Sequence, residues 1–329
     1  MTRRILILLS LFALASTAFA QKVKTFDATY TATVKAIPAG TKNLKVWIPL
    51  PMTCGPQVVS DLVIDSPYHW TRYTDPEFGD QYAYAVIPNP PAGDFRVDVH
   101  FNARRSEALM TAPTETSASP AELQRALRAD RLVTLSPRVS KLAAQLTAGK
   151  TTTIEKAHAI YDYVSSSIKY DKTIPGWGHG DTERVCDVRA GNCTDFHSLF
   201  LSLARASGIP ARFVIGFPLT AKDGEVTGYH CWAEFYVKGR GWIPIDASEA
   251  SLSSDPMRRA YLFGNLDPDR IQFTMGRDLV LHPKTAEPLN YFIYPHAEAN
   301  GAEVGTASIA LHFREVNASG MTSSNGASR

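Results

Sequence analysis

The chain has 329 residues, of which 44% are hydrophobic and 20% are charged, and its formal net charge at pH 7 is only +2. This composition is typical of a globular protein, and at about 150 residues per domain the length favours two domains. Because the sequence contains no basic run or stripe, it predicts no nucleic-acid partner.

The first twenty residues have the pattern of a secretory signal peptide. Arg3 and Arg4 give a basic start, residues 5–15 are almost wholly apolar, and residues 18–20 read Ala-Phe-Ala, a small-x-small cleavage pattern. The apolar run is short for a membrane span of about 20 residues, which disfavours an uncleaved anchor. We therefore expect cleavage before Gln21, a periplasmic or secreted protein, and no membrane insertion after cleavage.

Alternating apolar and polar residues then mark strands. The alternation is clean over residues 26–35, 44–50 and 95–101, and Pro- and Gly-rich segments such as 89–93 separate these runs. Such alternation is typical of half-buried antiparallel strands. Residues 21–110 are therefore predicted to form a β-sandwich-like N-terminal domain, which either holds a partner or braces the rest of the chain.

Helical signals follow. Residues 111–150 are predicted to be a helical linker region, in which Ser119-Pro120 and Ser136-Pro137 each resemble an N-cap followed by proline at the first helical position. A third helix is expected at about 154–167. Residues 151–315 would form the second domain. The remainder, 316–329, is rich in Ser, Asn, Gly and Ala and is predicted to be a disordered tail.

Residues 191–196, Gly-Asn-Cys-Thr-Asp-Phe, open a further helix with Cys193 at its first position. Asn192 suits the N-cap, and Gly208 is expected to end the helix. The free N–H groups and partial positive charge of a helix N-terminus favour a thiolate, which is the nucleophilic form of cysteine. The backbone N–H of Cys193 could also stabilise an oxyanion. The alternative is that Cys193 is a small buried structural residue.

A thiolate nucleophile needs a base, and the base needs a group that orients it. Residues 228–237 alternate as a strand with His230 on one face and Cys231 on the other, so Cys231 is predicted to be a core residue. The chain then returns over residues 241–247, which carry Asp246.

The length of the connecting loop decides whether these side chains can meet. A loop of three residues pairs Val237 with Gly241 and places Asp246 diagonal to His230 on one face, whereas an even loop places it on the other face. We therefore predict the odd register, or a bulge at Pro244 with the same effect.

Four blocks resemble the transglutaminase-like core, a papain-related fold. They are residues 191–200 (GNCTDFHSLF), 208–213 (GIPARF), 228–235 (GYHCWAEF) and 241–248 (GWIPIDAS). The blocks follow the family order at family-like spacing, and the resemblance covers roughly residues 150–285. The whole chain resembles bacterial exported proteins described as transglutaminase-like or as candidate cysteine proteases.

The resemblance implies an α+β core, in which a helix bearing the cysteine packs on an antiparallel sheet bearing histidine and aspartate. Cys193 would be the nucleophile, His230 the general base and acid, and Asp246 the orienting group, with Trp177 or Tyr170 completing the oxyanion or substrate site. The expected reaction is acyl transfer from an amide of a peptide or protein through a thioester, as in a protease, a deamidase or a transglutaminase. No cofactor and no metal are expected, and the three residues leave open whether water or an amine is the acyl acceptor.

Other interpretations remain open. The chain is alternatively a catalytically silent binding or scaffold module with the same fold. Its four cysteines permit disulfides, at most one if Cys193 is the nucleophile, and a Cys186–Cys193 bridge would act as a redox cap. The Gly-rich segment 176–181 is either a mobile loop that carries Trp177 to the substrate or an ordinary turn. His197 is expected to be structural.

Overall fold

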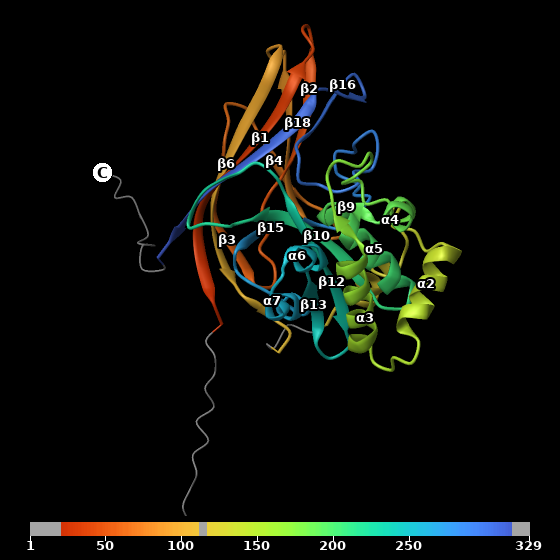
Figure 1. Ribbon diagram of the computed structural model, residues 1–329. Helices are drawn as coiled ribbons and strands as arrows, with labels where there is room; N and C mark the ends of the chain where they lie inside the picture. The colour runs from red at the N-terminus through yellow and green to blue at the C-terminus, as the bar shows by residue number, and fades with distance from the viewer. Residues whose placement is uncertain (1–20, 112–116, 318–329) are drawn as a thin grey trace, which may run out of the picture.

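The computed structural model describes residues 21–111 and 117–317 (Figure 1). The expected signal peptide, residues 1–20, lies outside the described residues, as does the expected tail 316–329 apart from its first two residues. Within the described part of the chain, no helix combines the length and the apolar character that crossing a bilayer requires.

Two five-stranded antiparallel sheets contain the N-terminal strands. Their orders are β11-β18-β1-β6-β3 and β17-β16-β2-β5-β4. The first sheet consists of β1 (Val23–Ile37), β3 (Gln57–Asp65), β6 (Gly93–Ser106), β11 (Asp223–Val226) and β18 (Thr306–Val316). The second consists of β2 (Asn43–Pro49), β4 (Thr71–Thr74), β5 (Gln81–Pro88), β16 (His296–Ala299) and β17 (Ala302–Glu303). The long strands β1, β6 and β18 run side by side along one flank of the molecule (Figure 1).

Strands from the C-terminal end of the chain complete both sheets. The alternating apolar residues of β1 are buried, from Phe26 to Val34, and β18 pairs with β1 from Thr25 to Lys35. The second edge of β1 is thereby covered, which removes a row of unpaired backbone groups. Strands from residues 296–316 therefore belong to the same two sheets as the strands that precede the expected domain boundary at residue 110.

A third antiparallel sheet, of order β13-β12-β10-β15, supports the helices. Its strands are β10 (Ala211–Pro218), β12 (His230–Val237), β13 (Gly241–Ile245) and β15 (Arg270–Met275). Helix α5 (Cys193–Ala206) packs on this sheet and is surrounded by α2 (Pro137–Thr147), α3 (Thr153–Ser167), α4 (Thr182–Val188) and α6 (Ala247–Leu252). The short elements are α1 (Pro120–Arg125), α7 (Pro256–Tyr261), the β7–β14 pair (Ala108–Leu109 with Asn265–Leu266) and the parallel β8–β9 pair (Lys169–Tyr170 with Ala190–Gly191). This mixture confirms the expected α+β fold class.

The helix starts predicted from the two serine–proline pairs are confirmed. Ser119 caps α1 and Ser136 caps α2, each with proline in the first turn. Because α2 contacts both α3 and α5, it belongs to the helical layer over the third sheet. The expected linker region therefore supplies part of the packed core.

One hydrophobic core joins the strand-rich and the helical parts of the molecule. The ring of Tyr30 on β1 lies 5.9 Å from Phe217 on β10 and 5.0 Å from Phe273 on β15, measured between ring centroids. The amide of Gln57 on β3 donates to the carbonyl of Gln272 at 2.8 Å. The first sheet thus braces the sheet that carries the candidate site.

Candidate active site

Cys193 is the first residue of helix α5, as predicted. Asn192 caps the helix by accepting a hydrogen bond from the N–H of Thr194 at 2.9 Å, and the carboxylate of Asp195 accepts from the N–H of Asn192 at 2.9 Å. These capping contacts do not engage the N–H of Cys193. The Cys193 side chain is buried at the helix end where N–H groups and the macrodipole favour a negative charge.

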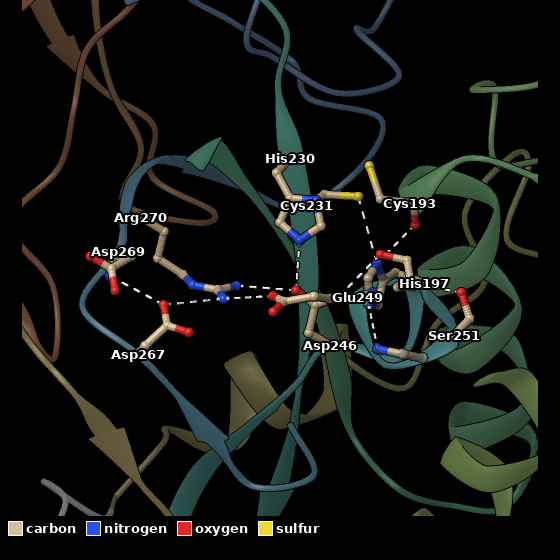
Figure 2. A network of polar contacts seen from close by, with 12 residues as sticks. Cys193, His197, His230, Cys231, Asp246, Glu249, Ser251, Asp267, Asp269 and Arg270 are labelled. Carbon is tan, nitrogen blue, oxygen red and sulfur yellow. Dashed lines mark hydrogen bonds and ion pairs between the residues drawn. The ribbon is translucent and has the colours of Figure 1, made fainter. Parts of the chain in front are cut away.

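The β12–β13 hairpin brings His230 and Asp246 together (Figure 2). Val237 pairs with Gly241, which confirms the predicted odd register. Asp246 follows directly on β13, and its Oδ2 accepts a hydrogen bond from Nε2 of His230 at 2.6 Å. His230 also acts on Cys193, because its hydrogen bond and charge are among the causes that lower the pKa of the Cys193 thiol. The three residues predicted from sequence therefore lie in one connected group.

Asp246 has further donors besides His230. Its Oδ1 accepts from the N–H of Glu249 at 2.9 Å and from the hydroxyl of Ser248 at 3.1 Å, so the same carboxylate caps helix α6. Its Oδ2 also accepts from Nη1 of Arg270 at 3.1 Å. A buried carboxylate with this many donors is held ionised and fixed in orientation.

Arg270 is a part of the site that sequence reasoning missed. It lies on β15, is 3% exposed, and forms ion pairs with Glu249 at 3.2 Å and Asp267 at 3.5 Å in addition to Asp246. Its guanidinium stands 5.3 Å from the ring centroid of the buried Trp232. No motif surrounds Arg270 in the sequence, because Asp246 and Glu249 lie more than 20 residues away and meet it only in the folded chain.

The electrostatics of the three residues favour a thiolate–imidazolium pair. Burial raises the pKa of the Cys193 thiol, but hydrogen bonds from Cys231 and His230 and the charge of His230 outweigh burial and bring this pKa well below its usual value. Burial lowers the pKa of His230, but the charge and hydrogen bond of Asp246, followed by those of Cys193, raise it to about 10. Burial likewise opposes ionisation of Asp246, whose pKa is nevertheless held well below its usual range by His230.

His197 lies one helical turn after Cys193 and is fully buried. Its Nδ1 donates to the backbone oxygen of Cys193 at 2.8 Å, and its Nε2 accepts from the N–H of Ala247 at 3.1 Å. Burial lowers its pKa, and a proton on Nε2 would break the second bond. His197 is therefore a neutral residue that ties the start of α5 to the start of α6.

Cys231 does face the core, on the side of β12 opposite to His230. That buried side of β12 packs against the first turn of α5. Its sulfur lies 3.9 Å from the hydroxyl of Thr194 and 3.6 Å from Nδ1 of His197. The alternation of β12 identified the buried face correctly. It contained no signal that the nucleophile approaches from that face.

The Gly-rich segment 176–181 is fixed in place. Asp195 accepts from the N–H groups of Gly178 at 2.7 Å and Gly180 at 3.1 Å, and the carbonyl of His179 accepts from Arg277 at 2.9 Å. These contacts favour an anchored turn rather than a mobile loop. Trp177 itself is 39% exposed.

A cavity of about 650 Å³ opens beside His230. Its lining includes Tyr170, Glu249, Arg258, Arg270 and Lys222. Tyr170 is half-buried, and its pKa is raised by burial and then by the charge of Cys193. Of the two residues proposed to complete the site, the structure therefore places Tyr170 at the cavity, whereas Trp177 is not among the lining residues.

Tyrosine rings cover the Cys193 end of α5. The hydroxyl of Tyr229 accepts from the side chain of Asn192 at 3.0 Å and lies 2.9 Å from the hydroxyl of Thr194. The rings of Tyr291 and Tyr294 pack on Tyr229 at centroid distances of 5.6 and 5.9 Å. These rings pack over the helix start, where the Cys193 side chain is buried.

Among the described residues, His230, Asp246 and Glu249 could together contact one metal ion, since their donor atoms lie within 4.8 Å of one another. Arg270 forms ion pairs with both carboxylates, and His230 is held by Asp246 and Cys193. The positive Arg270 side chain already neutralises both carboxylates, so a cation would have to compete with it. This donor set therefore does not fit a metal.

The fold and the matched sequence define a transglutaminase-like core. Residues 140–247 match the model of the Transglutaminase-like superfamily. The structure aligns with that of a candidate cysteine protease from Cytophaga hutchinsonii with a TM-score of 0.62 and 16% identity, covering 90% of this chain and 92% of that chain. At this identity the likeness shows the fold alone.

Two sequence relatives extend the match. An uncharacterized protein of Haemophilus influenzae is 27% identical over 317 residues, which is 84% of this chain and 85% of the relative. The Bacillus subtilis protein YebA is 30% identical over 131 residues, covering 35% of this chain and 18% of YebA. Residues 140–247 of the chain therefore form a transglutaminase-like core.

Proposed function

We propose that the chain is a cysteine-dependent acyltransferase or hydrolase that acts on amide bonds of peptides or proteins. One observation carries the proposal: Asp246 accepts a hydrogen bond from Nε2 of His230 at 2.6 Å, and His230 in turn lowers the pKa of the Cys193 thiol. This is the order of nucleophile, base and orienting group that acyl transfer requires.

In the first half of the reaction, the Cys193 thiolate attacks the amide carbon and the carbonyl oxygen becomes an oxyanion. The backbone N–H of Cys193, which the helix cap does not engage, points from the helix N-terminus and is a donor for that oxyanion. Tyr170 is the second candidate donor, because it lines the cavity next to His230. Collapse of the intermediate breaks the C–N bond as the His230 imidazolium protonates the leaving amine.

The second half reverses the role of His230. Once the thioester forms, Cys193 no longer carries the negative charge that helps to raise the His230 pKa. The pKa of the imidazole therefore falls, and His230 can accept a proton from the incoming nucleophile. Water as nucleophile gives hydrolysis or deamidation, and a primary amine gives crosslinking.

The test is iodoacetamide labelling followed by intact-protein mass spectrometry from pH 5 to 9, comparing the wild type with His230→Ala. We expect rapid single-site alkylation of Cys193 that persists below the unperturbed thiol pKa of about 8.5, and slower labelling by about tenfold or more in the variant. Cys54 is the internal control, because burial raises its pKa to about 12. Slow labelling that ignores His230 would instead support a silent binding or scaffold module.

The acceptor is tested separately with glutamine-containing peptides. Ammonia release in buffer alone indicates deamidation, and cleavage of the peptide backbone indicates proteolysis. Incorporation of an added primary amine into the peptide indicates transglutamination. Cys193→Ala is the matched control in all three assays, because it removes only the nucleophile.

We also propose that residues 1–20 direct export. The proposal rests on the basic, apolar and small-x-small order of these residues. N-terminal sequencing of the protein recovered from a bacterial host should then give Gln21 as the first residue. An intact Met1 terminus in the exported fraction would contradict cleavage.

A further inference from the structure

A second sulfur atom, that of Cys231 on β12, lies against the first turn of α5. Cys231 is fully buried, and its sulfur lies 3.9 Å from the hydroxyl of Thr194 and 3.6 Å from Nδ1 of His197. The same His197 nitrogen bonds the backbone oxygen of Cys193 at 2.8 Å. Figure 2 shows both sulfurs on the same side of His197.

The two sulfurs are in different states. Cys193 favours the thiolate, whereas burial and the neighbouring negative charge of Cys193 keep Cys231 protonated by raising its pKa well above the usual value. One member of the pair is therefore an electron-rich nucleophile, and the other is a thiol that can attack only after that negative charge is gone.

We propose that Cys193 and Cys231 form a redox pair, in which a hydroperoxide oxidises Cys193 and Cys231 then closes a disulfide that blocks the active site reversibly. The proposal rests on the activated thiolate of the proposed function and goes beyond it by assigning a role to Cys231. Cys231 takes no part in the helix cap, and in the acyl-transfer mechanism it only helps to lower the Cys193 pKa.

The chemistry balances in two steps. The Cys193 thiolate attacks a peroxide oxygen, the O–O bond breaks, and Cys193 becomes a sulfenic acid as the peroxide is reduced to hydroxide or alkoxide. Cys231 then loses its proton and attacks the sulfenic sulfur, so that the S–S bond forms, the S–O bond breaks, and the departing hydroxide takes up a proton to become water. A dithiol reductant converts the disulfide back to the two thiols by thiol–disulfide exchange.

Neutralisation of Cys193 in the first step prepares the second. A sulfenic acid carries no full charge, so the Coulombic cause that raises the Cys231 pKa disappears. His230, whose raised pKa keeps it protonated, is the acid that protonates the leaving hydroxide. Without Cys231, the sulfenic acid would proceed to sulfinic and sulfonic acids, which thiols do not reverse.

The experiment uses peptide mapping of the full mature chain after graded hydrogen peroxide, with and without subsequent dithiothreitol, in the wild type and in Cys231→Ser. Trypsin separates all four cysteines, placing Cys193 in peptide 190–205, Cys231 in 223–238, Cys186 in 185–189 and Cys54 in 46–72. A Cys54→Ser/Cys186→Ser background variant removes the two other thiols as competing partners.

In the wild type we expect a linked 190–205/223–238 species, with loss of Cys193 alkylation that dithiothreitol restores. In Cys231→Ser we expect no linked species, and Cys193 should gain oxygen atoms that dithiothreitol does not remove. Equal, irreversible oxidation of Cys193 in both proteins would overturn the inference, as would linkage of Cys193 only to Cys186.

Iodoacetamide labelling of the reduced proteins distinguishes this failure from failure of the proposed function. If Cys193 labels rapidly below pH 8.5 in a His230-dependent way but no linked peptide forms, the redox inference alone is wrong. If labelling is slow, independent of His230, and no linked peptide forms, both proposals are wrong.

Discussion

Two buried aspartates flank Cys193 and differ in what surrounds them. Asp246 is held by charged donors, His230 and Arg270, and its pKa lies well below the usual range. Asp195 is held mainly by backbone N–H groups, and burial outweighs them, so its pKa is raised. Burial alone therefore does not decide the role of a carboxylate. Nearby charge makes Asp246 an electrostatic partner of the base, whereas Asp195 is an anchor for the turn 176–181.

The largest expected effect comes from Asp246→Asn. Asparagine is as good an N-cap as aspartate, so α6 should keep its start. His230 would lose the charge that raises its pKa, and with it the stabilised thiolate. We expect iodoacetamide labelling of Cys193 at pH 6 to slow by at least about tenfold, and turnover of an amide substrate to fall by about 10³–10⁴-fold.

A thermal melt of Asp246→Asn provides the control for this prediction. A melting temperature close to that of the wild type would show that the loss is electrostatic. If Asp246→Asn were labelled at pH 6 as fast as the wild type, Asp246 would not support the thiolate. The contrast with Asp195 would then disappear.

Arg270→Gln should give the largest loss of stability. The change leaves Asp246, Glu249 and Asp267 without their shared buried cation, and breaking a buried ion pair from one side costs about 3–5 kcal/mol. Urea unfolding at pH 7 measures this loss. Arg131→Gln is a matched control, because its ion pair with Asp278 is half-exposed, and such pairs contribute about 0–1 kcal/mol. Equal losses in both variants would show that the Arg270 cluster adds no special stability.

The parts of the site that could be predicted are those with local signals. An N-cap residue before an apolar helical stripe located Cys193, and glycines around a short loop set the register that joins His230 to Asp246. Arg270 and Cys231 reach the site through packing between segments distant in sequence. Periodicity shows which face of a strand is buried, but it does not show which helix end lies against that face.

The same limit applies to the fold. The alternation of β1 predicted a half-buried strand, and the structure confirms this. The pairing of β1 with β18 joins residues near opposite ends of the chain, and only the burial of both strands together stabilises it. Local patterns therefore predicted the elements, while their long-range partners required the structure.

A smaller effect is expected from Asp195→Asn. The amide oxygen can accept from two of the three N–H groups, but its NH₂ would face the third donor, so the free energy of unfolding should fall by about 1–3 kcal/mol. Because Asp195 does not contact His230, labelling of Cys193 should change by less than about tenfold, or one pKa unit. Faster proteolysis within residues 176–181 would report the released turn. A loss of labelling as large as that of Asp246→Asn would remove the distinction between the two aspartates.

The smallest effect is expected from a change of pH, which titrates the Cys193–His230 pair without changing a residue. In the unfolded chain, histidine titrates at about 6.5 and cysteine at about 8.5. In the folded chain the His230 pKa rises to about 10, and the Cys193 pKa falls well below its usual value. Between about pH 6.5 and 8.5 the Cys193–His230 pair therefore binds one proton in both states. In the unfolded chain the proton is on the sulfur, and in the folded chain it is on the imidazole.

Stability from this pair should form a plateau over that window and fall on both sides. Below about pH 6.5 the unfolded chain binds a second proton, and above about 8.5 it loses its only proton while folded His230 keeps its own up to about pH 10. Each side should slope by at most about 1.4 kcal/mol per pH unit. The measurement is the difference in unfolding free energy between the wild type and Cys193→Ala/His230→Gln from pH 5 to 10. A difference that rises steadily through the window would mean that the folded pair has already lost its proton, so the charge on Asp246 would not raise the His230 pKa.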